Sequence, residues 1–562
     1  GITADNLTVE SGKTQQLLSR SNKVKNLTIK GKGAGGSLMV DGVTRFNGTT
    51  DNLLVTVADS HIKGDVLIEN YQADTGKITI NSDIDTSKYN DEHTGNITVK
   101  ADGDITTAGG VDLNAADKAS INSKKGSVAT GGNVTANNDV DIDAANNITA
   151  SGNLTSTSAN VDLLAGGSIT TNGTVNAHDN VIANANGNIT TDGDVTSQTG
   201  KAKLNSSTGN VNTGNVKANS DVDIDAANNI TASGNLSSTN ANVDLNAGGS
   251  ITTQGTVTAL NNVIANANGN INTNGAVTAE HGKVALNSKG GNVNTGNVKA
   301  NDDVDIDAAN NITANGNLTS TNANVDLKAN GGSITTQGTV NAHNNVIANA
   351  NGNINTNGAV TAENGKAELN SSTGSVTTKK VTAGQAVDID AKQDIKADGD
   401  LTSNNGDITL DAGGSITTNS IVNALNNVIA NANGNIATNG DVTAETGKAV
   451  LNSKGGNVNT GNVKADQAVD IDAAQDITAN GNLTSTNANV DLDAGGSIKT
   501  SGEVKAQQNV DYNAKGSITT EGIINSTAGN INLQTDAAQG DITFGGDVTA
   551  EHGNINIEVL QN

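Results

Sequence analysis

Aspartates alternate with apolar residues in a short motif, VDIDA, that recurs along this chain. Two full copies contribute Asp221, Asp223, Asp225, Asp303, Asp305 and Asp307. Alternation turns the carboxylates outward, and Ca²⁺ takes oxygen ligands of this kind. However, each triplet lies along one strand rather than around a loop, and the nonapeptide repeat of calcium-binding β-helices is absent. We therefore interpret the triplets as a solvated acidic stripe and expect no resident metal, with weak ion binding as the alternative.

Histidine is the next residue type that could do chemistry. The six copies are His61, His93, His178, His281, His343 and His552. His178 and His343 occupy equivalent repeat positions, but they lie two repeat blocks apart and the equivalent position between them holds Leu260. Polysaccharide-cleaving β-helices need paired carboxylates in a cleft with aromatic or arginine contacts to sugar. With three Tyr, two Phe and two Arg in the whole chain, we predict no enzymatic activity and no cofactor.

Two polar patterns suggest modification or ice binding, and both have a simpler structural explanation. Asn-x-Ser/Thr sequences are dense, including Asn6, Asn26, Asn47, Asn96, Asn133, Asn147, Asn153 and Asn188. They are glycosylation acceptors only where a glycosyltransferase meets them, and the same pattern follows from an asparagine at a turn before a strand. Outward Thr and Asn residues such as Thr252 and Asn272 form no persistent Thr-x-Thr array, which argues against ice binding.

An 82-residue block sets the positions of all these residues. The first valine of the VDIDA motif falls at Val140, Val222, Val304, Val387 and Val469, at intervals of 82, 82, 83 and 82. Within one block, shorter sub-repeats open at Val243, Val263, Val284, Val304 and Val325. The four steps between these valines are 20, 21, 20 and 21. Repeats of this length are typical of stacked solenoids.

Each sub-repeat contains three short runs in which apolar residues alternate with polar ones. In the sub-repeat at Val243 the runs are Val243–Ala247, Ile251–Thr253 and Val257–Ala259. Alternation of this kind is typical of β-strands with one inward face. The sequence therefore predicts an all-β fold: a right-handed parallel β-helix with three strands per coil. Zero Pro suits hydrogen-bonded strands, and we expect the 66 Gly and many Asn at corners with positive φ.

The chain divides into two regions by regularity. Residues 1–76 depart from the repeat, so we predict an N-terminal cap with irregular coils and a short helix over residues 12–23. Residues 77–562 form the repetitive rod, most regular over 119–510. The last coils are looser, and the sequence ends in a strand-like segment without an obvious cap. We expect the natural protein to continue beyond it, or that end to stack on another molecule.

The charge balance narrows the choice of partners. The net charge is −26, which makes nucleic acid an unsuitable partner because phosphate binding needs a basic surface. No run of about 18 apolar residues is present, so we predict no transmembrane segment. The sequence begins at Gly1 and its single methionine is Met39, and we expect a processed product or a fragment of a longer precursor.

Phrases such as GSITTQGTVTA, NVDLNAGGSI and GNINTNGAVTAEHGKVALNS resemble the repeats of filamentous haemagglutinin-like adhesins. These proteins are exported by two-partner secretion, and β-helical passenger regions of autotransporters look similar. The resemblance covers about residues 77–562. It implies a secreted or outer-surface fibre that acts in adhesion, aggregation or biofilm and meets a receptor on a host or neighbouring cell. The Asn-Pro-Asn type motif of the family's secretion domain is missing, since the chain has no Pro.

A second function class is a self-assembling filament whose subunits stack end to end by β-strand augmentation. In either case we expect recognition or junction contacts in the irregular parts of the chain, where arginine and bulky apolar residues gather. The candidates are Arg20, Arg45, Phe46, Ile555, Ile557 and Val559.

Overall fold

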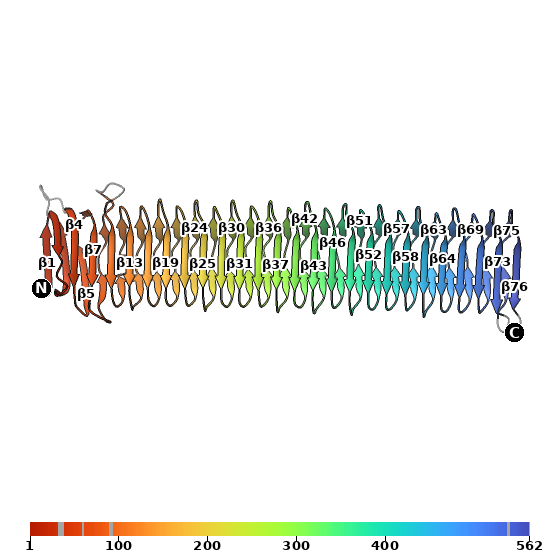
Figure 1. Cartoon of the computed structure of the whole chain (residues 1–562), viewed down its shortest axis with the longest axis horizontal. Coiled ribbons are helices and arrows are strands. Elements are labelled where there is room, and N and C mark those ends of the chain that lie inside the picture. Colours follow the sequence, from red (N-terminus) through yellow and green to blue (C-terminus); the bar gives the residue numbers. More distant parts are fainter. Residues whose placement is uncertain (32–38, 59–60, 89–93, 537–539, 561–562) are drawn as a thin grey trace. The chain divides into compact units, whose positions relative to one another are not determined.

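The computed structural model describes the chain except for residues 32–38, 59–60, 89–93, 537–539 and 561–562. It is an all-β, right-handed parallel β-solenoid with three strands per coil, which confirms the fold predicted from the repeat (Figure 1). No helix occurs among the residues it describes. The chain falls into two compact units, residues 1–282 and 283–562, each built from the same coil.

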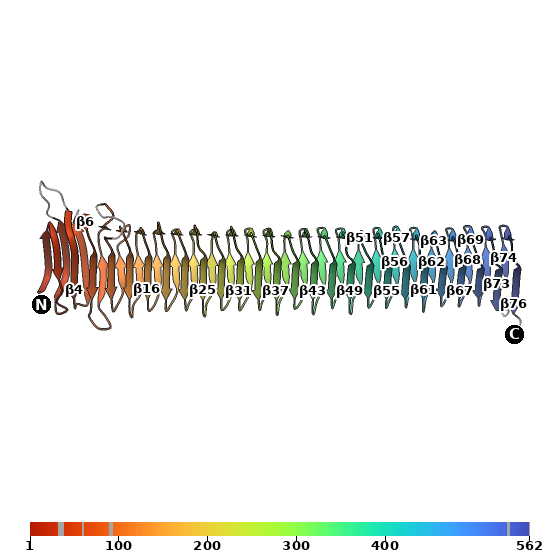
Figure 2. The same cartoon turned by 45° about the horizontal axis from the view of Figure 1, so that its top comes forward.

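One five-residue strand and two three-residue strands make up a regular coil. In the first unit, the coil that begins at Val222 consists of β28 (Val222–Ala226), β29 (Ile230–Ala232) and β30 (Leu236–Ser238). In the second unit, the coil at Val304 consists of β40 (Val304–Ala308), β41 (Ile312–Ala314) and β42 (Leu318–Ser320). Each strand pairs in parallel with its equivalent in the next coil (Figure 2). This stacking produces a long-strand sheet and two short-strand sheets in each unit.

The register between coils places like residues side by side. Val222 pairs with Val243 on β31 (Val243–Ala247), and Val304 pairs with Val325 on β43 (Val325–Ala329). All four valines are 0% exposed, while the aspartates that follow them face outward. The predicted inward and outward faces are therefore confirmed, and the core is a column of stacked Val, Ile, Leu and Ala side chains.

Glycine serves a different purpose at the corners from the one expected. Among the described residues, positive φ angles occur only at Asp74, Gly64, Gly95 and Gly110, so the expectation of positive-φ corners is wrong for the regular coils. A Cβ added to Gly248 would instead lie 2.0 Å from the carbonyl oxygen of Ala227 in the previous coil. Glycine is needed because successive coils approach too closely there for any side chain.

Corner asparagines join successive coils through their side chains. The Oδ1 atom of Asn147 accepts the backbone N–H of Ser168 at 2.8 Å, and Asn229 accepts that of Ser250 at 2.8 Å. Both asparagines belong to Asn-x-Thr sequences. The dense sequons therefore have a structural cause, because the asparagine satisfies a donor of the next coil and the threonine lies on the strand that follows.

Coils are already stacked in the N-terminal region, with longer strands. This region contains β1 (Thr3–Ser11), β2 (Lys13–Leu17), β3 (Lys23–Gly31), β4 (Met39–Gly48), β5 (Asn52–Ala58), β6 (His61–Lys63), β7 (Val66–Asn70), β8 (Lys77–Ile80) and β9 (Ile84–Asp85). The helix predicted over residues 12–23 is wrong, because β2 occupies that segment and pairs with β4 from Gln15 to Leu17. Strand pairing with β4 overrides the local helix propensity of the Gln-Gln-Leu-Leu run.

Candidate functional site

The first aspartate of each triplet lies at a corner and holds the next coil. Asp221 accepts hydrogen bonds from the backbone N–H and the side-chain amide of Asn242, at 3.1 and 3.2 Å. Asp303 accepts the same pair from Asn324, at 3.0 and 3.1 Å. These two carboxylates are therefore capping groups for the corner, and only the other two members of each triplet lie on the outward face of the strand.

Asp223 and Asp305 each face a second aspartate on the following strand. Asp223 on β28 pairs with Asp244 on β31, and Asp305 on β40 pairs with Asp326 on β43. We call the aspartates that stack on another aspartate at this position of the long-strand sheet the aspartate ladder; its members are Asp141, Asp162, Asp223, Asp244, Asp305, Asp326, Asp470, Asp491 and Asp511. Alternation along a single strand does not predict this ladder, although the VDL motif one sub-repeat after VDIDA is a visible signal of it.

Lysines lie beside the first aspartate of three ladder pairs. Lys118 Nζ lies 2.6 Å from a carboxylate oxygen of Asp141, and Lys203 Nζ lies 2.7 Å from one of Asp223. In the second unit, Lys283 Nζ lies 3.6 Å from Asp305. Each lysine comes from the coil before the aspartate that it contacts. The preceding coil thus supplies a positive charge to the first aspartate of the pair.

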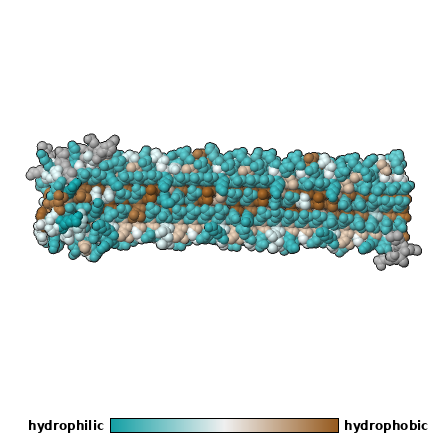
Figure 3. Space-filling view, in the orientation of Figure 1, coloured by the Kyte–Doolittle hydropathy of each residue, from teal (hydrophilic) through white to brown (hydrophobic). Residues whose placement is uncertain are grey.

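In the pairs that end at Asp162, Asp244 and Asp326, the second aspartate lies beside an isoleucine on its other side. Asp162 pairs with Ile182 on β22 (Val181–Ala185), and Asp326 pairs with Ile347 on β46 (Val346–Ala350). Partial burial, and then repulsion from the aspartate of the preceding strand, raise the pKa of Asp162 to about 6 and that of Asp326 to about 6. Figure 3 shows hydrophobic groups at intervals on an otherwise hydrophilic face.

Protein groups occupy the outward members of the two predicted triplets. Asp223 and Asp225 contact Lys203, and Asp225 also accepts a hydrogen bond from Asn246 at 3.1 Å. Asp307 accepts one from Asn330 at 2.7 Å. Within the described ranges, no group of three or more His, Cys, Asp or Glu residues is arranged to hold a metal ion.

A shallow polar groove runs along the corner that follows the long strands of the second unit. One part of it, about 450 Å³, is lined by residues of several successive coils, among them Asp390, Asp411, Lys392 and Lys454. Gly413 also lines this part, and a Cβ there would meet the backbone carbonyl oxygen of Lys392 at 2.1 Å. A further part lies at Gly495 and Gly496, which are the equivalents of Gly413 and Gly414 in the next repeat block. The groove can form hydrogen bonds and ion pairs with a polar partner, and it stays open to solvent.

The N-terminal candidates lie in different environments. The Arg20 guanidinium lies over the ring of Tyr71, 4.2 Å from its centroid, and the Tyr71 hydroxyl donates to the carboxylate of Glu69. Burial and this contact with Glu69 raise the pKa of Tyr71. Arg45 is half-buried, whereas Phe46 is 1% exposed and packs in the core. The interpretation of Phe46 as a recognition residue is therefore corrected: its ring fills the wide N-terminal coils.

The C-terminal candidates lie on β76 (Ile555–Leu560), at positions that are core positions in the preceding coil. Ile555 and Ile557 pair with Ile531 and Leu533 of β73 (Ile531–Asp536), which are buried. On β76 the side chains of Ile555, Ile557 and Val559 are 44%, 53% and 47% exposed. These three side chains thus form an apolar strip in register with the core.

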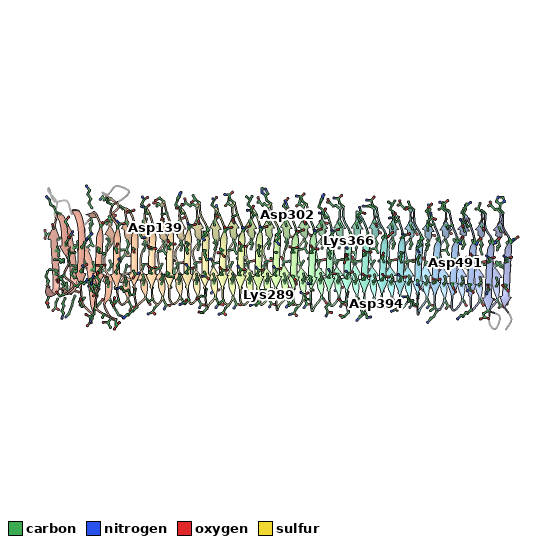
Figure 4. All side chains as sticks on the ribbon, viewed as in Figure 1. Asp139, Lys289, Asp302, Lys366, Asp394 and Asp491 are labelled. Carbon is green, nitrogen blue, oxygen red and sulfur yellow. The ribbon has the colours of Figure 1, made fainter. Side chains whose placement is uncertain are left out.

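His178 and His343 each lie near one acidic side chain. His343 Nδ1 lies 3.2 Å from a carboxylate oxygen of Glu363, and His178 Nε2 lies 4.0 Å from one of Asp179. His93 and the side chain of His61 lie outside the described residues. All side chains of the described part are drawn in Figure 4, where Lys366 and Asp491 are labelled.

In the part of the chain that the structure describes, no helix is long and apolar enough to cross a membrane. No protein-family model matches the sequence, and comparisons with curated proteins and with solved structures give no significant match.

Proposed function

We propose that this chain is a secreted or cell-surface fibrous protein of the filamentous haemagglutinin-like type, a β-helical stalk that acts in adhesion, aggregation or biofilm. The observation that supports this most is the unchanged coil register from block to block. Val222 pairs with Val243, and one block later Val304 pairs with Val325 in the same way. Blocks of this kind extend a solenoid without creating a new type of contact, because each coil touches only its neighbours.

The composition of the coil surface supports a stalk rather than a catalyst. Outward positions carry Asp, Asn, Thr and Lys, and the net charge of −26 favours solubility and repulsion between copies. The groove beside Asp390 and Asp411 is open, whereas catalytic sites need an enclosed, preorganised environment. We therefore assign the chain no enzymatic role, no cofactor and no nucleic-acid partner, and place it outside the cell or on the bacterial outer surface.

Recognition in this proposal belongs to the N-terminal region. Arg20 is exposed and lies over the ring of Tyr71, whose hydroxyl donates to the carboxylate of Glu69. Arginine and tyrosine are enriched at protein interfaces, and the regular coils hold few aromatics. The expected partner is a receptor on a host or neighbouring cell.

Adherence of coated beads tests this function. Beads carrying the full chain should attach to epithelial cells or to Gram-negative bacterial cells, and soluble chain should compete. Beads that attach no better than albumin-coated beads to either cell type would contradict the adhesin proposal.

The exposed strip on β76 favours a second candidate function, a filament assembled end to end. Ile555, Ile557 and Val559 are apolar and exposed, in register with the buried column of the preceding coil. A second copy stacked on this strand would bury them by β-strand augmentation. Negative-stain images should then show continuous fibres, and Ile557→Lys should leave single particles. Single particles for the unaltered chain at micromolar concentration would exclude this candidate.

A further inference from the structure

Stacked carboxylates recur on the long-strand sheet at a fixed spacing. Asp162 on β19 (Val161–Ala165) pairs with Asp141 on β16 (Val140–Ala144). In the second unit, Asp491 on β67 (Val490–Ala494) lies between Asp470 on β64 (Val469–Ala473) and Asp511 on β70 (Val510–Ala514). Adjacent strands are about 4.8 Å apart, and like charges directly opposite each other destabilise a sheet.

The charged groups around Asp491 are acidic on every neighbouring strand. Asp493 shares its own strand, Asp470 and Asp472 lie on β64, and Asp511 lies on β70. Partial burial and then repulsion, first from Asp511 and next from Asp470, raise the pKa of Asp491 to about 6. The positive charge of Lys448, one coil before Asp470, acts on Asp470.

Asp326 and Asp162 have both charged and neutral neighbours, and the pKa of each carboxyl group is raised, as it is for Asp491. The coil before Asp326 carries three acidic residues, Asp303, Asp305 and Asp307. Lys328 lies on the same strand as Asp326. The following strand carries the neutral residues Ile347 and Asn349. Around Asp162, the preceding coil presents Asp139, Asp141 and Asp143, and Lys118 lies one coil further away, in contact with Asp141. In both cases isoleucine removes water from one side of the carboxylate while aspartate repels it from the other.

We propose that the aspartate ladder makes this solenoid acid-stabilised, so that protonation of alternate carboxylates in mildly acidic solution strengthens the stacking of the coils. A protonated aspartate loses its repulsion from the neighbour and can donate a hydrogen bond to it. This pH dependence goes beyond a stalk function, because the free energy of unfolding of the stacked coils then depends on the pH of the surroundings.

The direction of the effect follows from proton linkage. A carboxyl group with a pKa of about 6 in the folded chain and about 4 in the unfolded chain binds more protons when folded between those values. Stability therefore rises as the pH falls from about 7 to about 4. Ion-paired carboxylates oppose this below about pH 5, where the unfolded chain begins to bind their protons: hydrogen bonds from Lys396 and Asn419 lower the pKa of Asp398 to about 2. The stability optimum then lies in mild acid rather than at neutrality.

The test compares three proteins at pH 7.5 and pH 5.0, in low salt with EDTA, by thermal unfolding followed by circular dichroism. The first is the full chain, and the second carries Asp162→Asn, Asp326→Asn and Asp491→Asn. Asparagine is close in size and occurs naturally at this ladder position as Asn532 beside Asp511. The third is matched in charge, with Asp192→Asn, Asp302→Asn and Asp547→Asn at exposed corners.

The unaltered chain should melt at a higher temperature at pH 5.0 than at pH 7.5, by several degrees. The ladder variant should melt higher than the other two at pH 7.5, and its pH difference should shrink by at least half. The corner variant should keep the pH difference of the unaltered chain. A lower melting temperature at pH 5.0 for the unaltered chain, or the same pH difference in all three proteins, would overturn the proposal.

Discussion

Gly248 lies so close to the carbonyl oxygen of Ala227 in the preceding coil that a Cβ would meet that oxygen at 2.0 Å. The same relationship joins Gly166 to Ala145, again at 2.0 Å. Both glycines follow a long strand directly, where the chain turns toward the first short-strand sheet. The corner therefore depends on the absence of a side chain, and the stacking distance is fixed by the backbone itself.

Gly248→Ala should destabilise the first unit by about 1–3 kcal/mol, the usual range for overpacking. Differential scanning calorimetry of the full chain measures the effect as a lower unfolding temperature. Gly109→Ala is the control, because a Cβ there meets nothing within 4 Å. Equal losses in the two variants would show that glycine acts through chain flexibility rather than through the close approach of coils.

Val304→Asp should be severely destabilising, since Val304 is 0% exposed and pairs with Val325 in the core. An unpaired carboxylate placed there costs at least about 3 kcal/mol. The neighbouring change Asp305→Asn alters an outward residue on the same strand and should not lower the unfolding temperature. Limited proteolysis would show new cleavage near residue 304 only in the first variant. Similar cleavage in both would contradict the assignment of the two faces.

Lys203→Met should weaken the first unit modestly. Lys203 Nζ lies 2.7 Å from Asp223 and 3.5 Å from Asp225, and a partly exposed ion pair contributes about 0.2–1 kcal/mol. Urea unfolding in low salt should detect the loss, and 1 M NaCl should reduce it by screening. Lys217→Met, at an exposed position of the second short-strand sheet, serves as the control. A loss that persists unchanged in high salt would point to packing of the lysine stem instead.

Chelation should leave the solenoid intact. Asp221 and Asp303 accept hydrogen bonds from Asn242 and Asn324, so the corners of the triplets are held by protein groups. EDTA should shift the melting temperature by less than a degree at constant pH and ionic strength. A large decrease in EDTA that Ca²⁺ restores, but Mg²⁺ does not, would contradict this expectation.

Period and alternation predict the coil well because they report on burial directly. The alternation predicts that Val243 and Val304 point inward, and both are fully buried. The close contact at Gly248 was not predictable from local preferences, since it depends on the carbonyl of Ala227 in the preceding coil. For the same reason the strand β2 and the burial of Phe46 escaped prediction: both depend on pairing in the irregular coils.

The stacking of carboxylates can be predicted from the sequence, but only when the sequences of successive sub-repeats are aligned with one another. Asp244 follows Asp223 by one sub-repeat and lies directly beside it. A motif read along one strand gives three carboxylates in a line, whereas alignment of successive sub-repeats shows the pair across strands. The raised pKa of Asp162 and Asp326 also needs the position of Ile182 and Ile347 on the next strand.

The central claim is that the repeats extend the chain while the N-terminal region recognises the partner, and bead adherence of two variants tests it most directly. Deletion of residues 387–468 removes one repeat block, four coils of the second unit, and joins Ala386 to Val469 with the Gln-Ala-Val-Asp-Ile-Asp-Ala sequence intact. The second variant is Arg20→Glu, with Lys217→Glu as its charge-matched control. Circular dichroism verifies that all three proteins keep their β-structure.

The deletion should shorten the second unit by about 19 Å, four strand spacings, and leave adherence within twofold of the unaltered chain. Arg20→Glu should reduce adherence at least tenfold, and Lys217→Glu should not. If the deletion abolishes adherence while Arg20→Glu preserves it, the repeats themselves carry the recognition and the account is contradicted.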